Sequence, residues 1–170
     1  MNFVIDKKKC KVTLLDTGQN TMTGGRVKRI AKIMPDNMFC LTYGDGVANI
    51  NLKKLINLHY KKKKLITVTA VNPPARFGEL KIKKSKVFNF SEKKSILQSW
   101  INGGFFVINK KFIQLIKNDQ SILEREPLEN ACKIGELVAY KHFKFWQCMD
   151  TKRDRDKLNN LVKSKRAKWL

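Results

Sequence analysis

The chain has 170 residues, 42% of them hydrophobic, and a formal net charge of +22 at neutral pH. A chain of this length and apolar content can bury the core of one domain, which excludes wholesale disorder. The sequence holds no apolar run of the roughly 18 residues that a membrane-spanning helix needs, and its N-terminus does not follow the basic-then-apolar pattern of a signal peptide. We therefore expect one cytoplasmic domain over residues 1–170, without a membrane segment.

The large positive charge has two interpretations. It could mark a surface that binds nucleic acid, or it could reflect Lys residues on solvated faces. The basic clusters Lys7–Lys9 and Lys61–Lys64 contain neither Arg nor an aromatic side chain, the residues that read grooves and stack on bases. We favour the solvated faces and keep a basic nucleic-acid-binding module as a lesser alternative. The same positive field would attract anionic sugar phosphates and nucleotides.

The first half of the chain alternates between strand and helix patterns. Strands are predicted at Val12–Leu15, at Phe39–Tyr43 and in the β-branched run Ile66–Val71. Helices are expected over Gly24–Met34 and over Asn51–His59, where Asn51 is the N-cap, because both stretches carry apolar residues at helical spacing. Phe39–Tyr43 is a compact apolar run, as in strands that are covered on both faces. The alternation predicts an α/β sheet with parallel central strands.

The pattern changes after Pro73. Two short strands near Glu79–Ile82 and Val87–Phe90 indicate an appended β-hairpin. The remaining elements are expected as a strand, two helices, a strand and a charged helix at Phe105–Ile108, Lys110–Ile116, Glu126–Cys132, Leu137–Tyr140 and Arg153–Val162. Sheets of this kind usually begin with a βαβ unit of about 30 residues, but only Phe3–Ile5, which fits an edge strand, precedes Val12.

Two acidic residues follow predicted strands. Asp45 lies between two glycines directly after Phe39–Tyr43, and Asp150 follows the apolar run that begins at Phe145. Ligands of open α/β sheets bind at the carboxyl ends of strands, and Mg²⁺ commonly takes one or two carboxylates together with substrate phosphates. The alternatives are that Asp45 belongs to a simple turn and that Asp150 is the N-cap of the following helix.

Further polar residues surround the predicted hairpin. Lys93, after Glu92, would suit a substrate phosphate, and Asn102 could bond sugar hydroxyls while Gly103 and Gly104 clear space. Earlier in the chain, small residues and an Arg at Thr23–Arg26 open a helix, which is a favourable place for an anion.

These pieces occur in order from about Val12 to the C-terminus, and together they resemble the glucose-1-phosphate cytidylyltransferase family. The strings that carry the resemblance are Asp16–Gly18, Met22–Arg26, Tyr43–Gly46, Thr67–Val71, Pro73–Pro74 with Arg76–Gly78, Glu92–Lys93, Trp100–Val107, Glu124–Glu129 and Phe145–Thr151. The family joins CTP and α-D-glucose 1-phosphate to give CDP-glucose and diphosphate, for dideoxysugar and O-antigen-type polysaccharide synthesis. The resemblance implies part of a nucleotidyltransferase fold, a Rossmann-like mixed sheet flanked by helices with an appended β-hairpin.

The resemblance also implies roles for individual residues. Asp45 and Asp150 would hold Mg²⁺ and, with Lys93 on the sugar phosphate, form the catalytic set. The implied substrate-binding residues are Thr21 and Arg26 for the nucleotide, Glu92 and Asn102 for the glucose hydroxyls, and Tyr43, Gly44 and Gly103 beside them. Catalysis would then consist of positioning and charge neutralisation around an in-line attack on the α-phosphate.

The sequence departs from the family pattern in two places. Lys94 follows the Glu-Lys pair where the family has Pro. The chain contains neither the family's Gly-rich loop ending in Gly-Thr-Arg-Leu nor its Pro-Lys-Pro segment, so we expect the first βαβ units to be missing. The enzyme would then work as a homo-oligomer or with a separate N-terminal half, and the alternative is an inactive remnant.

Overall fold

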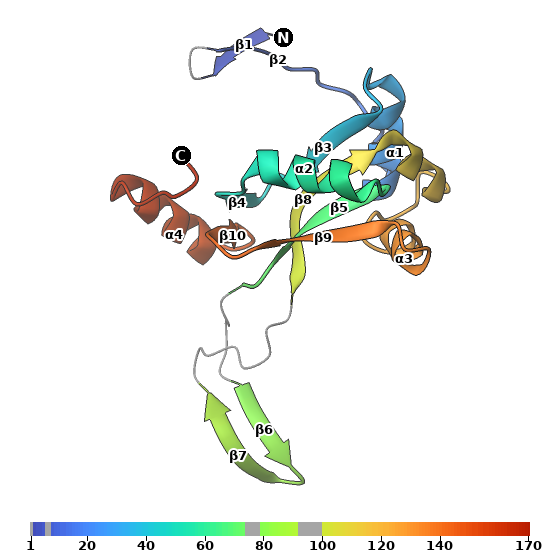
Figure 1. Ribbon diagram of the computed structural model, residues 1–170. Helices are drawn as coiled ribbons and strands as arrows, with labels where there is room; N and C mark the ends of the chain where they lie inside the picture. The colour runs from blue at the N-terminus through green and yellow to red at the C-terminus, as the bar shows by residue number, and fades with distance from the viewer. Residues whose placement is uncertain (1, 6–7, 74–78, 92–99) are drawn as a thin grey trace.

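The computed structural model describes residues 2–5, 8–73, 79–91 and 100–170. Its centre is a four-stranded sheet in the order β3 (Met38–Thr42), β8 (Ile101–Asn109), β5 (Ile66–Val71) and β9 (Leu137–His142) (Figure 1). β8 is antiparallel to both of its neighbours, whereas β5 and β9 are parallel. The expected mixed α/β sheet is confirmed. β3 and β5 run in the same direction, as expected of parallel strands, but the antiparallel β8 lies between them, so the two central strands, β8 and β5, are antiparallel.

Helices cover both faces of this sheet (Figure 1). On one face, α1 (Thr23–Ile33), the 3₁₀ helix η1 (Lys110–Leu115) and α3 (Glu126–Lys133) contribute to one buried cluster that is centred on Phe106 and Phe112. On the other face, α2 (Leu52–Lys62) packs against β5. β8 carries four consecutive apolar residues, Phe105–Ile108, and successive side chains of a strand point to opposite faces, so the strand contributes to both layers. The predicted helices at these positions are confirmed, with η1 taking the tighter 3₁₀ form.

Local signals explain where α2 begins and ends. The Asn51 side chain accepts a hydrogen bond from the Lys54 amide at 2.9 Å, as the predicted N-cap should. Leu55 and His59 are buried one turn apart on the inner face. The helix ends where Lys63 adopts a left-handed conformation with φ of 52°. A hydrogen bond of 2.9 Å between His59 Nδ1 and the Thr67 hydroxyl joins the inner face of α2 to β5.

The burial of β3 differs from the expectation. Phe39 is buried, but Cys40 and Thr42 point outwards and are exposed, so the strand is covered on one face only. β3 also pairs with β8 alone among the described strands, which makes it an edge of the sheet. An apolar run of this length therefore indicated a strand correctly but overstated its burial.

The remaining strands form three small pairs. β1 (Asn2–Ile5) pairs with β2 (Lys8–Lys11), and β6 (Glu79–Lys83) pairs with β7 (Lys86–Ser91) as the predicted hairpin. The strand expected at Val12–Leu15 is wrong: this segment forms no ladder, and Leu14 is 77% exposed. The third pair joins β4 (Gly46–Ala48) to β10 (Trp146–Cys148), just before the C-terminal helix α4 (Lys152–Lys163). No described helix is both long enough and apolar enough to span a bilayer.

Candidate functional site

The pairing of β4 with β10 brings the two strand-end acids into one place. In this antiparallel ladder Gly46 lies opposite Cys148, and the Met149 amide donates to the Asp45 carbonyl at 2.8 Å. Asp45 therefore lies opposite Met149, the residue that precedes Asp150. Residues that are about 100 positions apart in sequence thus end at the same corner of the fold.

The helix that follows Asp150 has its own cap. The hydroxyl of Thr151 accepts from the Asp154 amide at 3.2 Å, and the Asp154 carboxylate accepts from the Thr151 amide, which completes a capping box. The alternative role of Asp150 as the N-cap is therefore wrong. The Asp150 carboxylate instead accepts a hydrogen bond from Cys148 Sγ at 3.2 Å and remains exposed.

The two carboxylates suit a hard divalent cation. Both Asp45 and Asp150 are exposed, and their oxygen donors are the kind that Mg²⁺ or Mn²⁺ accepts. Over the described ranges, no group of three or more His, Cys, Asp or Glu side chains could hold a metal ion. This donor set therefore fits a cation that shares its coordination with substrate phosphates rather than one enclosed by protein.

Gly103 and Gly104 allow close packing at the start of β8. Gly104 has φ of +76°, and a Cβ there would lie 2.7 Å from Cδ2 of the Tyr43 ring. A Cβ on Gly103 would lie 2.7 Å from Cγ1 of Val71, and the indole N–H of Trp146 donates to the Gly103 carbonyl at 2.8 Å. The space that we expected these glycines to clear for a ligand is therefore filled by Tyr43 and Val71.

Tyr43 is the centre of a hydrogen-bonded chain. Its hydroxyl donates to Oε1 of Glu124 at 2.5 Å and accepts from the Asn102 amide at 3.0 Å. The ring packs edge-on against Phe106, with 5.6 Å between centroids. Burial, together with the hydrogen bond to Glu124 and its negative charge, raises the pKa of Tyr43 far above its ordinary value. Tyr43 is therefore a neutral donor at physiological pH.

The N-terminus of α1 is occupied by protein. The Gly24 and Gly25 amides both donate to the Ser121 carbonyl, at 2.9 and 3.3 Å. A Cβ on Gly24 would lie 2.6 Å from the Ser121 carbonyl oxygen, and one on Gly25 would lie 2.6 Å from that of Asp119. The two glycines thus let the segment after η1 pass directly over the helix. Because their amides are already bonded, the expected anion site at this helix terminus is not available on them.

Of the predicted nucleotide-contacting residues, Thr21 lies on the segment that leads into α1 and Arg26 lies in the first turn of that helix. Thr21 is buried, and the Arg26 guanidinium donates to the Thr17 hydroxyl at 2.5 Å and to the Gln19 carbonyl at 3.3 Å. The turn is closed by Gly18, whose amide donates to the Asp16 carboxylate at 2.7 Å. Arg26 therefore holds this loop and has further N–H groups that are not used in these two bonds.

The structure brings some predicted residues together and leaves others aside. Tyr43 and Asn102 are in direct contact, and Asp45 and Gly44 adjoin them along the chain. A Cβ on Gly44 would meet no atom within 4 Å, so this position faces open space. Glu92 and Lys93 lie outside the described residues. Sequence reasoning missed Glu124 as the partner of Tyr43 and Thr23 as the second partner of Glu124, although both belong to the strings that carried the family resemblance.

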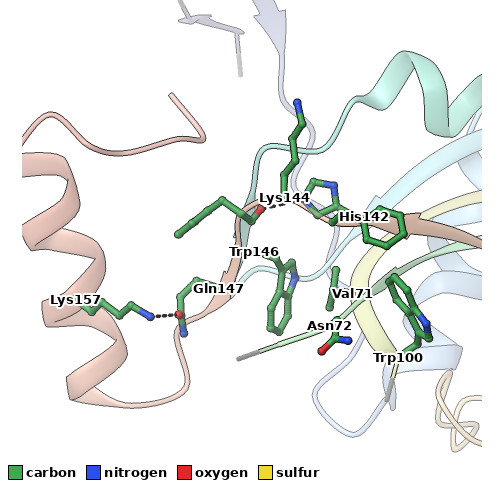
Figure 2. A pocket seen from close by; sticks show the side chains of 10 residues that line it. Val71, Asn72, Trp100, His142, Lys144, Trp146, Gln147 and Lys157 are labelled. Atoms are coloured by element: carbon green, nitrogen blue, oxygen red, sulfur yellow. Dashed lines mark hydrogen bonds between the residues drawn. The ribbon is translucent and has the colours of Figure 1, made fainter. Parts of the chain in front are cut away.

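A cavity of about 470 Å³ lies at the ends of β5 and β9. Figure 2 shows Val71 and Asn72, from the end of β5, between the indoles of Trp146 and Trp100. Lys157 of α4 reaches the rim, where its ammonium donates to the Gln147 side chain at 2.7 Å, and Lys144 lies on the loop between β9 and β10. The lining contains these two lysines and no carboxylate, so the cavity favours anions.

Known proteins share this sequence and fold. A sequence profile of the family described as nucleotidyl transferase matches residues 6–151. The glucose-1-phosphate cytidylyltransferase of Salmonella typhimurium (strain LT2) is 47% identical over 159 residues, which cover 93% of this chain and 62% of the relative. A Bacillus subtilis (strain 168) protein named as a probable glucose-1-phosphate cytidylyltransferase is 41% identical over 160 residues, covering 94% of this chain and 63% of its own length.

Solved structures show the same fold at lower identity. HddC from Yersinia pseudotuberculosis matches with a TM-score of 0.61 and 23% identity, over 81% of this chain and 60% of that one. A putative glucose-1-phosphate thymidylyltransferase from Bacillus anthracis matches with a TM-score of 0.61 and 16% identity, over 85% and 63% of the two chains. The chain spans less than two thirds of the length of these relatives.

Proposed function

This chain belongs to the nucleotidyl transferase family, and from that premise we propose that it acts as a glucose-1-phosphate cytidylyltransferase. The observation that carries the proposal is the meeting of Asp45 and Asp150 at one corner of the fold through the β4–β10 ladder. It is supported by 47% identity to a cytidylyltransferase over 93% of the chain. Enzymes of this family generally use a divalent metal, and we propose Mg²⁺ as that ion.

The proposed reaction is a single in-line displacement. A phosphate oxygen of glucose 1-phosphate attacks the α-phosphorus of CTP and forms a new P–O bond. The bond from the α-phosphorus to the bridging oxygen breaks, and diphosphate leaves with that electron pair. Bound Mg²⁺ would neutralise phosphate charge, and the protein's part is to hold the two substrates in line.

Individual residues have the following proposed tasks. Asp45 and Asp150 hold the cation, Lys93 the sugar phosphate, and Glu92 and Asn102 the glucose hydroxyls. Thr21 contacts the nucleotide from the segment before α1 and Arg26 from the first turn of α1. Tyr43, Gly44 and the main chain of Gly103 complete the substrate-binding surface. Asn102 is supported most directly, because its amide bonds to Tyr43 and lies near the loop of Asp45.

We further propose that activity depends on a second polypeptide segment. Among the described strands β3 pairs only with β8, and its outward residues Cys40 and Thr42 are exposed. The chain covers only 62% of the Salmonella relative. A partner segment that pairs with this edge would complete the sheet, either from another chain or within a cytoplasmic homo-oligomer. The alternative is a remnant that binds ligand without turnover.

The test has two arms. In the first, the purified chain is incubated with CTP, glucose 1-phosphate and Mg²⁺, and diphosphate and CDP-glucose are measured; we expect no synthesis. In the second, the N-terminal segment of the Salmonella relative that this chain does not span is expressed together with it, and we expect synthesis to appear. Restored turnover supports the enzyme, whereas inactivity in both arms favours the remnant. Robust synthesis by the chain alone would show that no partner segment is needed.

The metal assignment is tested in the active mixture. Asp45→Asn and Asp150→Asn should each lower kcat by about 100-fold or more. Each substitution removes a carboxylate that holds the cation, and the positive charge of the cation stabilises the transition state. Asp36→Asn is the matched control: Asp36 is also exposed but lies in the loop before β3. Equal activity of all three variants would refute the assignment.

A further inference from the structure

Four side chains form a continuous path from the start of α1 to the start of β8. The Thr23 hydroxyl donates to Oε2 of Glu124 at 3.0 Å, and Oε1 accepts from the Tyr43 hydroxyl at 2.5 Å. The Tyr43 oxygen in turn accepts from the Asn102 amide at 3.0 Å. Glu124 is 101 residues from Thr23 and 81 residues from Tyr43, so only the fold creates this path.

The direction of each hydrogen bond follows from Glu124. An ionised carboxylate can only accept, so both hydroxyls must direct their protons towards it. The Tyr43 oxygen is then left with acceptor sites alone, and its neighbour Asn102 must present the amide nitrogen rather than the oxygen. The Asn102 oxygen is held on the other side by the Gly104 amide, which donates to it at 2.9 Å.

Both ends of the Asn102 side chain are therefore fixed. Turning the amide over would place its NH₂ against the Gly104 N–H and its oxygen against the Tyr43 oxygen, which are two repulsive contacts. In the fixed orientation one N–H is bonded to Tyr43 and the second N–H remains for another acceptor. The group that Asn102 can offer a ligand is thus a donor, and this suits an oxygen of a sugar.

Thr23 connects Glu124 to the start of α1, next to the residues that are proposed to contact the nucleotide. Its hydroxyl also accepts from the Leu123 amide at 2.9 Å, which fastens the segment carrying Glu124 to the start of α1. Thr21, the buried residue proposed to contact nucleotide, lies two positions earlier. One hydroxyl at the start of α1 therefore contacts both the Glu124 carboxylate and the main chain of the segment that carries it.

We propose that Glu124 is a positioning residue that, through Tyr43, fixes Asn102 as a hydrogen-bond donor to a hydroxyl oxygen of a hexose phosphate. Thr23 holds the same carboxylate through a second hydrogen bond, next to the segment that is proposed to contact the nucleotide. The inference rests on the proposed function for the identity of the ligand, but the orientation of Asn102 is a property of the chain itself.

The decisive variant is Glu124→Gln, which keeps the shape and removes the charge. A Gln amide can donate to the Tyr43 oxygen, so Tyr43 is no longer forced to accept from Asn102. Glu129→Gln is the matched control, because Glu129 is equally exposed and lies on α3 beyond the network. Thr23→Val and Thr23→Ser form a second pair, in which only Ser keeps the hydroxyl. Glu124 is exposed, so its replacement does not open the core.

Two measurements are made on the full chain. The first is calorimetric titration with glucose 1-phosphate in the presence of Mg²⁺, where Glu124→Gln and Thr23→Val should weaken binding by about tenfold or more, the effect of losing a hydrogen bond to a charged group. Glu129→Gln and Thr23→Ser should bind as the unaltered chain does. The second is NMR of the Asn102 side-chain amide, with Tyr43→Phe as the reference for loss of the Tyr43 hydroxyl.

In the NMR measurement Glu124→Gln should shift the Asn102 amide signals, because the Tyr43 oxygen no longer has to accept a hydrogen bond from that amide. Unchanged Asn102 signals overturn the proposal, and so does unchanged affinity despite shifted signals. If glucose 1-phosphate does not bind even when the N-terminal segment of the Salmonella relative is expressed together with the chain, the proposed function fails. The proposed orientation of Asn102 by Glu124 is then tested by the NMR measurement alone.

Discussion

At Gly104 a single added methyl group should meet both backbone strain and a close neighbour. Its φ of +76° lies in the left-handed region, and a Cβ there would approach Tyr43 at 2.7 Å from Cδ2, 3.1 Å from Cγ and 3.3 Å from Cβ. In Gly104→Ala the backbone strain costs about 1–2 kcal/mol. The Tyr43 ring must also move, which weakens its bonds to Glu124 and Asn102 by about 1 kcal/mol each.

An opposing effect comes from the unfolded chain. Replacing Gly by Ala restricts the unfolded state and stabilises the fold by about 0.4–1 kcal/mol. The balance predicts that Gly104→Ala lowers the free energy of unfolding by about 2–3 kcal/mol. Urea unfolding followed by circular dichroism measures this difference directly.

Two other glycines separate the contributions. Gly135 also has a left-handed φ, of +71°, but a Cβ there would meet nothing within 4 Å, so Gly135→Ala reports backbone strain alone. Gly44 has neither a left-handed φ nor a close neighbour, so Gly44→Ala should be neutral or slightly stabilising. If Gly104→Ala is no less stable than Gly135→Ala, then contact with Tyr43 contributes nothing and the reasoning about this packing is wrong.

Two further predictions concern the two faces of the sheet. Gly25→Ala should destabilise the chain by about 2–3 kcal/mol in urea unfolding, the cost of overpacking, because its Cβ would lie 2.6 Å from the Asp119 carbonyl oxygen; stability equal to the unaltered chain would contradict the close crossing. His59 is buried and its pKa is lowered by that burial, so the unfolded chain binds its proton more readily. The free energy of unfolding should fall as the pH drops below about 6.5, the pKa of His59 in the unfolded chain. Urea unfolding of the unaltered chain and of His59→Gln, each above and below this pH, should show a smaller decrease in stability for the variant.

Much of the secondary structure could be predicted because its signals are local. The apolar spacing before Pro35, the N-cap Asn51 and the β-branched run Ile66–Val71 each act within a few residues, and all three elements formed as expected. Val12–Leu15 failed as a strand, because a β-branched or apolar run needs a partner strand and none of the described strands pairs with it.

The candidate site was predicted in part for the same reason. Asp45 and Asp150 each follow a strand pattern, and the rule that strand ends gather ligands placed them together in advance. Their meeting nevertheless depends on the short β4–β10 ladder, which has only three paired residues on each strand. Periodicity does not identify strands of that length.

The sequence by itself determined most of the longer helices and strands, the hairpin, the two strand-end acids and the family, because propensity, capping and motif strings depend on neighbouring residues. Only the tertiary structure decided that β8 separates β3 from β5, that Gly24 and Gly104 serve close packing, and that Glu124 directs Asn102 through Tyr43. These features join groups that lie some 60 to 100 residues apart. Their physical cause is steric contact and hydrogen-bond direction between distant segments, which no local pattern records.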